Sequence, residues 1–274
     1  MTTQQDLARR FHDLHRPGTP LVLANVWDAF GARLVVEAGA PAVATASASA
    51  SWTLGVPDGE GLDRDAAVAL VARVARSVAV PVTADIESGY GGSAAEVGRT
   101  VAAVLAAGAV GVNLEDGTRG AAEHAERIAA ARAAADAAGT ALYVNARTDG
   151  YLLGLGAPEE RFDEAVRRAK EYLAAGADGV FVPGVRDIAT VAALAAAIPA
   201  PLNVMAGPGA PSVAELAAAG AARISFGPAA ALAAYGTLRE AAGELYRTGG
   251  YTGLATSLTY GEANALMRGQ AHPA

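Results

Sequence analysis

The 274-residue sequence contains no cysteine, and this single absence removes several kinds of chemistry at once. Disulfides, thiolate nucleophiles, zinc-thiolate sites and iron-sulfur clusters all require cysteine. Lysine occurs once, as Lys170, on the charged side of an expected amphipathic helix, so we do not expect Schiff-base catalysis. None of the four histidines ends an expected strand, so a His-ligated zinc site lacks its ligands. They are His12, His15, His124 and His272.

A strong basic charge and long apolar runs are also missing. The net charge is -7 and the arginines are scattered, so the phosphate backbone of a nucleic acid is not an expected partner. No run approaches the roughly 20 bulky apolar residues of a membrane helix, and the polar start MTTQQDLARR lacks a signal-peptide core. With 52% hydrophobic residues the chain has ample material for a deep core. We expect a cytoplasmic globular protein.

Short apolar runs alternate with Ala-, Leu- and Arg-rich segments of helical period, which is the pattern of repeated β-α units with a parallel sheet. Four Ala-Gly-Ala tripeptides stand between a helical run and the next apolar run. Their glycines suit helix C-termini that need a left-handed residue. The eight expected strands cover residues 21–26, 42–47, 80–87, 109–116, 142–149, 179–183, 201–205 and 223–227.

Eight β-α units in this length predict an α/β fold of the (β/α)8 TIM-barrel type, occupying residues 1–240. The alternative is an open doubly wound sheet, but NVWDAFG stands where a G-x-G-x-x-G would follow the first strand. Two further helical runs, TLREAAGELYR and LTYGEANALMRG, exceed what the eighth helix of a barrel requires. We therefore expect residues 241–274 to form a C-terminal helical extension that packs on a neighbouring subunit.

Charged side chains collect at the C-terminal ends of the expected strands, where parallel barrels carry their active sites. Asp85 and Glu87 share a face at the end of the third strand, and Glu115 ends the fourth. Three carboxylates in a dry pocket repel one another unless protons or a cation neutralise them. With oxygen ligands and no His or Cys, the expected ion is Mg²⁺, with Mn²⁺ as the alternative. Arg147, on the fifth strand, then offers a planar fork for a substrate carboxylate or phosphonate.

A metal ion beside an arginine suits a small 2-oxo acid or 2-oxo diacid. The carboxylate and keto oxygens chelate the metal, which stabilises an enolate, while a far acidic group reaches the guanidinium. The alternative for each acid is an ordinary structural task, because acids at strand ends also cap helices or pair with arginines. Asp149 and Asp116, each followed by glycine, are expected to turn the chain, and Asp28 to cap the first helix.

Three loops could present backbone amides to a ligand, and each also has a simpler interpretation. The glycines after Glu87 permit close approach of a ligand or make a tight β-α turn. VMAGPGAPSV stands where many barrels place a phosphate-binding turn. TASASAS, at 45–51, could hold a carboxylate or be a low-complexity loop.

Six motifs together resemble the isocitrate lyase / phosphoenolpyruvate mutase superfamily over nearly the whole chain. They are NVWDAFGARL, LGVPDGEG, TADIESGYG, GVNLEDG, NARTD and GADGVFVPG, in the order and spacing of that superfamily. The resemblance implies a (β/α)8 barrel whose last helix is exchanged between subunits, giving homodimers and commonly homotetramers. It also implies Mg²⁺ and substrates that are 2-oxo acids, or that yield them when a C–C or P–C bond is broken or moved.

The resemblance further implies roles for particular residues. Asp85 corresponds to the direct metal ligand, and Glu87 and Glu115 correspond to carboxylates that hold metal waters. Arg147 corresponds to the clamp for the substrate anion, and Asp58 to a residue near the substrate. The implied substrate-binding residues also include Trp27, Thr45, Ala46, Ser47 and Asn203.

The chain departs from its relatives after the fourth strand. Isocitrate and methylisocitrate lyases carry a Lys-Lys-Cys-Gly-His loop whose Cys donates a proton, and the mutase has a longer gating loop. Here the segment reads GTRGAAEHAERI, which leaves Thr118 and Arg119 as the polar groups. A site that admits water would spoil phosphoryl transfer.

We therefore expect Mg²⁺-dependent cleavage of a C–C bond, by decarboxylation or hydrolysis of an oxaloacetate-type substrate. One alternative is phosphonopyruvate hydrolysis or a related P–C reaction, with Thr118 contacting the phosphonate. The other is a 2-oxo acid binding protein with little or no catalysis.

Overall fold

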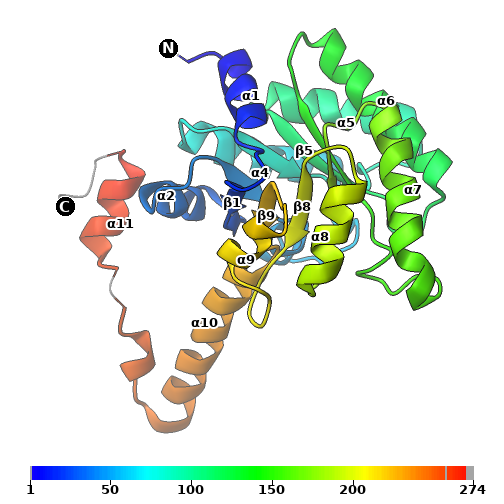
Figure 1. Ribbon diagram of the computed structural model, residues 1–274. Helices are drawn as coiled ribbons and strands as arrows, with labels where there is room; N and C mark the ends of the chain where they lie inside the picture. The colour runs from blue at the N-terminus through cyan, green and yellow to red at the C-terminus, as the bar shows by residue number, and fades with distance from the viewer. Residues whose placement is uncertain (1, 257, 270–274) are drawn as a thin grey trace.

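The structure, a computed structural model, describes residues 2–256 and 258–269. Its centre is a parallel sheet with the helices around its outside (Figure 1). The strands are β1 (Leu21–Leu23), β2 (Asn25–Val26), β3 (Val43–Thr45), β4 (Val82–Asp85), β5 (Gly111–Glu115), β6 (Tyr143–Arg147), β7 (Gly179–Phe181), β8 (Leu202–Met205) and β9 (Arg223–Ser225).

The first expected strand closes the sheet into a barrel. It is interrupted at Ala24, so that β1 pairs with β9 and β2 pairs with β3. The strand order is β1-β9-β8-β7-β6-β5-β4-β3-β2, and its two ends are successive pieces of one segment of chain. The predicted (β/α)8 barrel is confirmed, and an open doubly wound sheet is excluded.

The helices follow the strands in the alternation that the sequence predicts. Asp28, Asp63 and Asp187 accept a backbone hydrogen bond at the start of α2, α4 and α8 respectively, as N-cap side chains do. The helices are α1 (Gln4–Asp13), α2 (Ala29–Glu37), α3 (Ser47–Thr53), α4 (Arg64–Ser77), α5 (Ala94–Ala106), α6 (Ala121–Ala137), α7 (Arg161–Ala174), α8 (Ile188–Ala197), α9 (Val213–Ala218), α10 (Ala229–Thr248) and α11 (Tyr260–Met267). The glycines of the four Ala-Gly-Ala repeats all have φ between 95° and 107°, which confirms the left-handed C-terminal position.

Outward-facing side chains of the strands form an apolar layer with the helices. Val112 and Leu114 of β5 are fully buried against Val101 of α5 and Ile128 of α6. Burying a side chain of this size contributes about 1.5–3 kcal/mol. This layer between sheet and helices therefore contributes to the stability of the barrel.

Side chains on the other face of the strands point into the barrel. At its N-terminal end the interior is apolar, and Phe11 of α1 packs there with Leu21, Leu23 and Tyr143. Gln4 of α1 fixes the helix across this end by donating to two carbonyls before β5, at 2.8 and 2.9 Å. The opposite, C-terminal end is the mouth, where Asp85, Glu115 and Arg147 end β4, β5 and β6.

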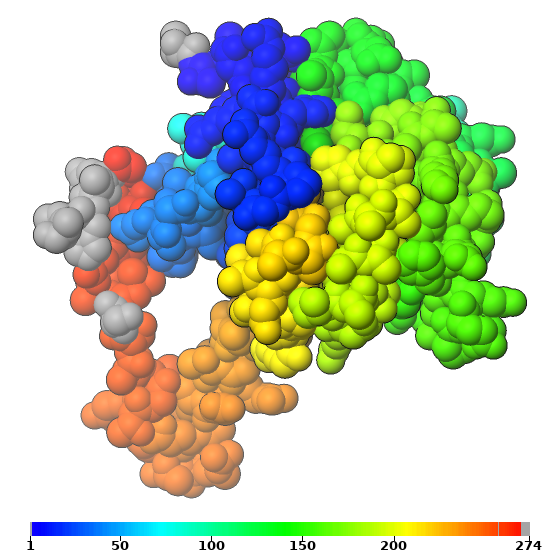
Figure 2. Space-filling model, viewed as in Figure 1, coloured from blue at the N-terminus to red at the C-terminus, as the bar shows by residue number. Residues whose placement is uncertain are grey.

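The C-terminal part of the chain leaves the barrel and then returns to it. α10 is one continuous helix, so the predicted boundary at residue 240 lies inside it. α11 lies against α2, where Arg33 Nη1 donates to the carbonyl of Leu266 at 2.6 Å. We call α10, α11 and the chain that joins them the C-terminal arm. Figure 2 shows open space between the described part of this arm and the barrel. Packing of the arm on a neighbouring subunit stays a prediction, and residues 257 and 270–274 of the predicted extension, with His272, lie outside the described residues.

Throughout the described part of the chain, no helix has both the length and the apolar character needed to cross a bilayer. The cytoplasmic location stays a prediction.

Candidate active site

Asp85 is the last residue of β4 and is held rigidly at the mouth of the barrel. Its backbone N–H donates to Thr45 Oγ1 at 2.9 Å, and the backbone N–H of Ser47 donates to Asp85 Oδ2 at 3.1 Å. The predicted Thr45-Ala46-Ser47 segment therefore lies beside Asp85. Ala46 is the N-cap residue of α3 and is buried. The other carboxylate oxygen, Oδ1, is buried and has no hydrogen-bond partner within residues 2–256 and 258–269. A buried acceptor of this kind is costly unless a ligand or water completes it.

Glu87 does not continue the strand with Asp85. β4 ends at Asp85, and Glu87 has φ of 49°, so the prediction that the two acids share a strand face is wrong. The left-handed turn aims Glu87 at the loop before α4, where the backbone N–H of Glu60 donates to Glu87 Oε2. The hydroxyl of Tyr90 donates to Glu87 Oε1 at 3.3 Å.

Burial, together with neighbouring acids, raises the pKa of two acids at the mouth. Burial raises the pKa of Glu87 to about 7, with Asp85 and Asp58 adding to the rise against the opposing hydrogen bond from Glu60. Burial also raises the pKa of Glu115 to about 8, although Arg147 works in the opposite direction. In both cases burial is the largest cause of the raised pKa, and the neighbouring carboxylates add to it.

Glu115 and Arg147 are in register on β5 and β6 and form an ion pair of 2.6 Å through Nη1. Arg147 Nε donates to Asp149 Oδ1, also at 2.6 Å. Burial alone would lower the pKa of Arg147, but the two carboxylates raise it. Its guanidinium also lies over the ring of Phe181, 5.7 Å from the centroid. The predicted anion clamp is thus fixed in place by two acids, one of which is a predicted holder of metal waters.

The donors at the mouth fit a magnesium ion held through one direct carboxylate. Across residues 2–256 and 258–269, no three His, Cys, Asp or Glu side chains are arranged to hold an ion together. Mg²⁺ commonly keeps several waters and uses one or two carboxylates, so such a three-ligand group is not required. Asp85 Oδ1 is the available oxygen, and Glu87 and Glu115 are nearby acids that could bind waters.

The remaining predicted residues lie in different environments. Asn203 is buried on β8, where its Oδ1 accepts from Ser225 at 3.3 Å and its Nδ2 has no partner. Trp27 is half-buried, 6.0 Å from the ring of Tyr235, and lines a hollow of about 280 Å³. Asp58 and Thr118 are exposed in loops. The structure therefore groups Asp85 with Thr45–Ser47, and pairs Glu115 with Arg147. It leaves Asp58 and Thr118 at the surface.

Asp116 does more than turn the chain. The predicted turn is present, since the N–H of Arg119 donates to the Asp116 carbonyl at 2.9 Å. Its carboxylate, however, is fully buried and accepts from the backbone of Asp149 at 2.9 Å and from the Tyr172 hydroxyl at 2.6 Å. Arg168 donates to it at 2.7 Å. Asp116 thus ties the ends of β5 and β6 to α7 and holds Asp149 against Arg147.

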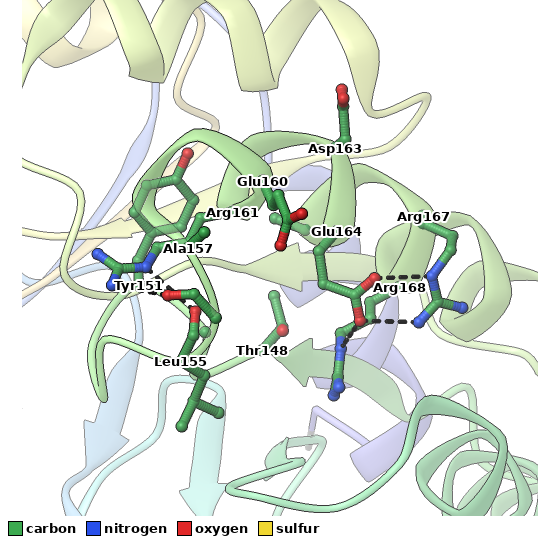
Figure 3. A pocket seen from close by; sticks show the side chains of 13 residues that line it. Thr148, Tyr151, Leu155, Ala157, Glu160, Arg161, Asp163, Glu164, Arg167 and Arg168 are labelled. Atoms are coloured by element: carbon green, nitrogen blue, oxygen red, sulfur yellow. Dashed lines mark hydrogen bonds and ion pairs between the residues drawn. The ribbon is translucent and has the colours of Figure 1, made fainter.

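A separate hollow of about 510 Å³ lies between the loop at 150–157 and α7 (Figure 3). Three of its charged groups pair with one another, because Glu164 accepts from both Arg167 and Arg168 at 2.7–2.8 Å. None of the predicted site residues lines it. This hollow is not part of the candidate site.

Sequence reasoning missed the group around Glu87. In the described chain the non-glycine residues with positive φ are Glu60, Glu87 and Tyr90, and all three are joined by hydrogen bonds. Ser88 adds a further bond from its hydroxyl to Glu60 Oε1. The sequence offers no signal for this arrangement beyond the nearby glycines, because such conformations are ordinarily occupied by glycine.

Comparison with known proteins assigns the family. Residues 11–246 match the family model described as phosphoenolpyruvate phosphomutase. The chain belongs to this family. The resemblance to the isocitrate lyase / phosphoenolpyruvate mutase superfamily is thereby confirmed, and members of it are lyases, mutases and hydrolases acting on C–C or P–C bonds.

Several members of known structure cover almost the whole chain. A protein of Burkholderia cenocepacia J2315, provisionally named a phosphonomutase, is 47% identical with a TM-score of 0.83, over 86% of this chain and 98% of that chain. Oxaloacetate acetylhydrolase in complex with 3,3-difluorooxalacetate is 25% identical with a TM-score of 0.86, over 97% and 94%. Phosphonopyruvate hydrolase in complex with oxalate and Mg²⁺ is 26% identical with a TM-score of 0.82, over 96% and 95%. Among the sequence relatives, a protein named oxaloacetate decarboxylase of Rhodopseudomonas palustris is 30% identical over 65% of this chain and 64% of its own length.

Proposed function

We propose that this protein is a Mg²⁺-dependent enzyme that cleaves a C–C bond of a small 2-oxo acid or diacid. Decarboxylation or hydrolysis of an oxaloacetate-type substrate is the leading reaction. The observation that carries the proposal is the buried, unpartnered Oδ1 of Asp85 among acids of raised pKa. Two related enzymes are named for oxaloacetate, and a third binds oxalate with Mg²⁺, which supports this substrate class.

The residues of the chain prepare the site before any substrate binds. Asp85 is held through its backbone and through Oδ2, so Oδ1 keeps one direction. Asp85, with Glu87 and Glu115 through waters, would hold Mg²⁺, which when bound would supply positive charge that stabilises an enolate. Arg147, held by Glu115 and Asp149, keeps its guanidinium in a fixed plane that orients a second acidic group of the substrate.

Access of water distinguishes this site from one built for group transfer. The segment after β5 is a short turn, and α6 begins at Ala121, so no long loop from this position covers the mouth. A reactive phosphoryl intermediate would be lost to water in such a site. Hydrolysis or decarboxylation tolerates the water.

The test is substrate consumption with and without Mg²⁺. Wild-type protein should consume oxaloacetate, detected by formation of pyruvate and CO₂ or of acetate and oxalate, and EDTA should abolish turnover. Asp85→Asn should reduce kcat/KM by at least 10³-fold and abolish Mn²⁺ binding measured by electron paramagnetic resonance. Asp187→Asn, which changes an exposed helix cap of the same residue type, is the matched control and should leave both unchanged. Unaltered turnover of Asp85→Asn would refute the assignment.

The second candidate is phosphonopyruvate hydrolysis. It is favoured by the 47% identity to a protein named as a phosphonomutase and by the likeness to phosphonopyruvate hydrolase. Thr118, exposed after β5, would contact the phosphonate, so Thr118→Val should lower turnover of phosphonopyruvate and not of oxaloacetate. Tight binding of pyruvate with no turnover of either compound would favour a binding protein instead.

The proposal includes assembly into homodimers or homotetramers through the C-terminal arm. Leu232, Leu238, Tyr246 and Tyr260 are large apolar side chains of this arm that are exposed in a single chain. Light scattering on the purified protein measures the mass directly. A monomer at micromolar concentration would contradict this part of the proposal.

A further inference from the structure

The interior of the barrel contains a column of polar side chains in addition to the apolar Phe11, Leu21 and Leu23 at its N-terminal end. Barrels of this type usually fill their interior with branched apolar side chains. Here Thr83 and Asp85 are two residues apart on β4, and Tyr143 and Asn145 are two residues apart on β6. The members of each pair therefore share a face of the sheet, and all four face inward. Asn203 and Arg223 are in register on β8 and β9 and share the same face. The column thus runs from Tyr143 and Arg223 at the floor to Asp85 at the mouth.

Every layer of this column contains buried polar atoms that no group among the described residues satisfies. They are Tyr143 Oη, Arg223 Nε and Nη1, Thr83 Oγ1, Asn145 Oδ1, Asn203 Nδ2 and Asp85 Oδ1. Most buried polar atoms in proteins have a partner, and those that lack one commonly bind ordered water. A run of such atoms from floor to mouth is therefore the signature of a hydrated interior.

Arg223 gives the column a charge. The side chain is 1% exposed, its guanidinium lies over the ring of Phe11 at 5.9 Å, and no ion pair among the described residues includes it. Burial lowers the pKa of Arg223 to about 10, against the opposing effects of Tyr143 and Asp85, so it remains a cation at neutral pH. A buried cation without a counter-charge is strongly destabilising.

The polarity of the unpartnered atoms changes along the column. At the floor Arg223 presents two donors, and Asn203 Nδ2 adds a third. Toward the mouth, Asn145 Oδ1 and Asp85 Oδ1 are acceptors, while the two hydroxyls can serve either way. Water accepts from the first group and donates to the second, so a file of waters would be oriented in one sense from Arg223 to Asp85.

We propose that ordered waters fill the barrel interior, and that through them Arg223 at the floor is the counter-charge of Asp85 at the mouth. The charge pair holds Asp85 Oδ1 in place without a direct salt bridge. The inference goes beyond the proposed function and does not depend on which substrate the site takes.

The test is a double-mutant cycle on unfolding by urea in EDTA, so that no cation masks the interaction. Arg223→Met and Asp85→Asn should each raise the unfolding equilibrium constant. Their combined effect should be at least tenfold smaller than the product of the two single effects, because the second substitution has no charge pair left to break. Arg223→Lys keeps the charge and should retain most of the coupling. Asp116 is the matched control carboxylate, because its partners lie in α7, and Arg223→Met with Asp116→Asn should show no coupling.

A crystal structure of the wild type at better than about 1.5 Å provides an independent readout that does not require any variant to fold. Waters that each contact at least two of the unpartnered atoms would support the inference. A dry column, a direct Arg223–Asp85 salt bridge, or an anomalous bromide peak at Arg223 after a soak would overturn it. Additive effects in the cycle would overturn it as well. Since neither experiment measures turnover, failure here is distinct from failure of the proposed activity.

Discussion

The floor of the barrel allows one steric prediction to be worked out in detail. Gly179, the first residue of β7, faces inward, and a Cβ added to it would lie 2.2 Å from Tyr143 Oη. Tyr143 has little freedom to move, because it is stacked on His15 at 3.9 Å and edge-on to Phe11 at 5.6 Å. Adding atoms at a close-packed position costs about 1–3 kcal/mol. We expect Gly179→Ala to destabilise by about 3 kcal/mol, the upper end of that range.

Removing the hydroxyl should relieve most of this cost. In Tyr143→Phe the 2.2 Å contact disappears, although contacts of 3.0 Å to the Pro201 carbonyl and 3.1 Å to the ring carbon remain. Gly179→Ala should then cost only about 1 kcal/mol in the Tyr143→Phe background, a coupling of about 2 kcal/mol. Gly207→Ala is the matched control, since its added Cβ would meet nothing within 4 Å.

The assay is urea unfolding followed by circular dichroism, supported by thermal midpoints. A loss of about 3 kcal/mol corresponds to a fall of roughly 6–12 °C in Tm for a domain of this size. Equal costs of Gly179→Ala in the Tyr and Phe backgrounds would refute the reasoning, because the hydroxyl would then not be the obstacle. A Gly207→Ala effect as large as that of Gly179→Ala would do so too.

Three further predictions follow from the charges. Burial lowers the pKa of His124 to about 4, so the unfolded chain alone takes up this proton between pH 6.5 and 4, and stability falls as pH drops through that window. His124→Phe should reduce this fall by roughly 3 kcal/mol in urea titrations at the two pH values. Because the pKa values of Glu87 and Glu115 are raised to about 7 and 8, calorimetry should show Mg²⁺ affinity rising from pH 6 to 8 with release of protons, and a pH-independent affinity would contradict this. Asp116→Asn removes the charge that Arg168 and Tyr172 bond and should cost about 2–3 kcal/mol in urea unfolding, with a loss below 0.5 kcal/mol arguing against a buried charge network.

The barrel itself could be predicted because its signals are local. Apolar runs, helix caps such as Asp28 and the Ala-Gly-Ala repeats each specify one element, and Gly39 and Gly108 have the expected left-handed conformation. Strand limits were less accurate, since residues 80–87 read as one strand whereas β4 is Val82–Asp85. Periodicity cannot show where the ladder of hydrogen bonds stops.

The parts of the site that the sequence did not reveal depend on contacts between distant segments. Glu60 meets Glu87 across 27 residues, and Asp116 meets Arg168 across 52. Arg223 opens an apolar run and gave no sign of facing inward, because the face of a strand depends on its register with neighbours. Asp85 was correctly placed at a strand end, but only the structure shows that one of its oxygens is already held by Ser47.

The conformation of Glu87 supplies an argument for use of its carboxylate that is independent of any relative. A non-glycine residue with φ of 49° is strained by about 1–3 kcal/mol, and Glu60 and Tyr90 beside it carry the same kind of strain. Glycine at position 87 would remove that strain and would cost the fold only the hydrogen bonds from Glu60 and Tyr90. Those bonds serve chiefly to hold the Glu87 side chain, and burial meanwhile raises its pKa. A buried, strained carboxylate of raised pKa is therefore explained poorly by stability, and the cation that we propose at the mouth would account for it.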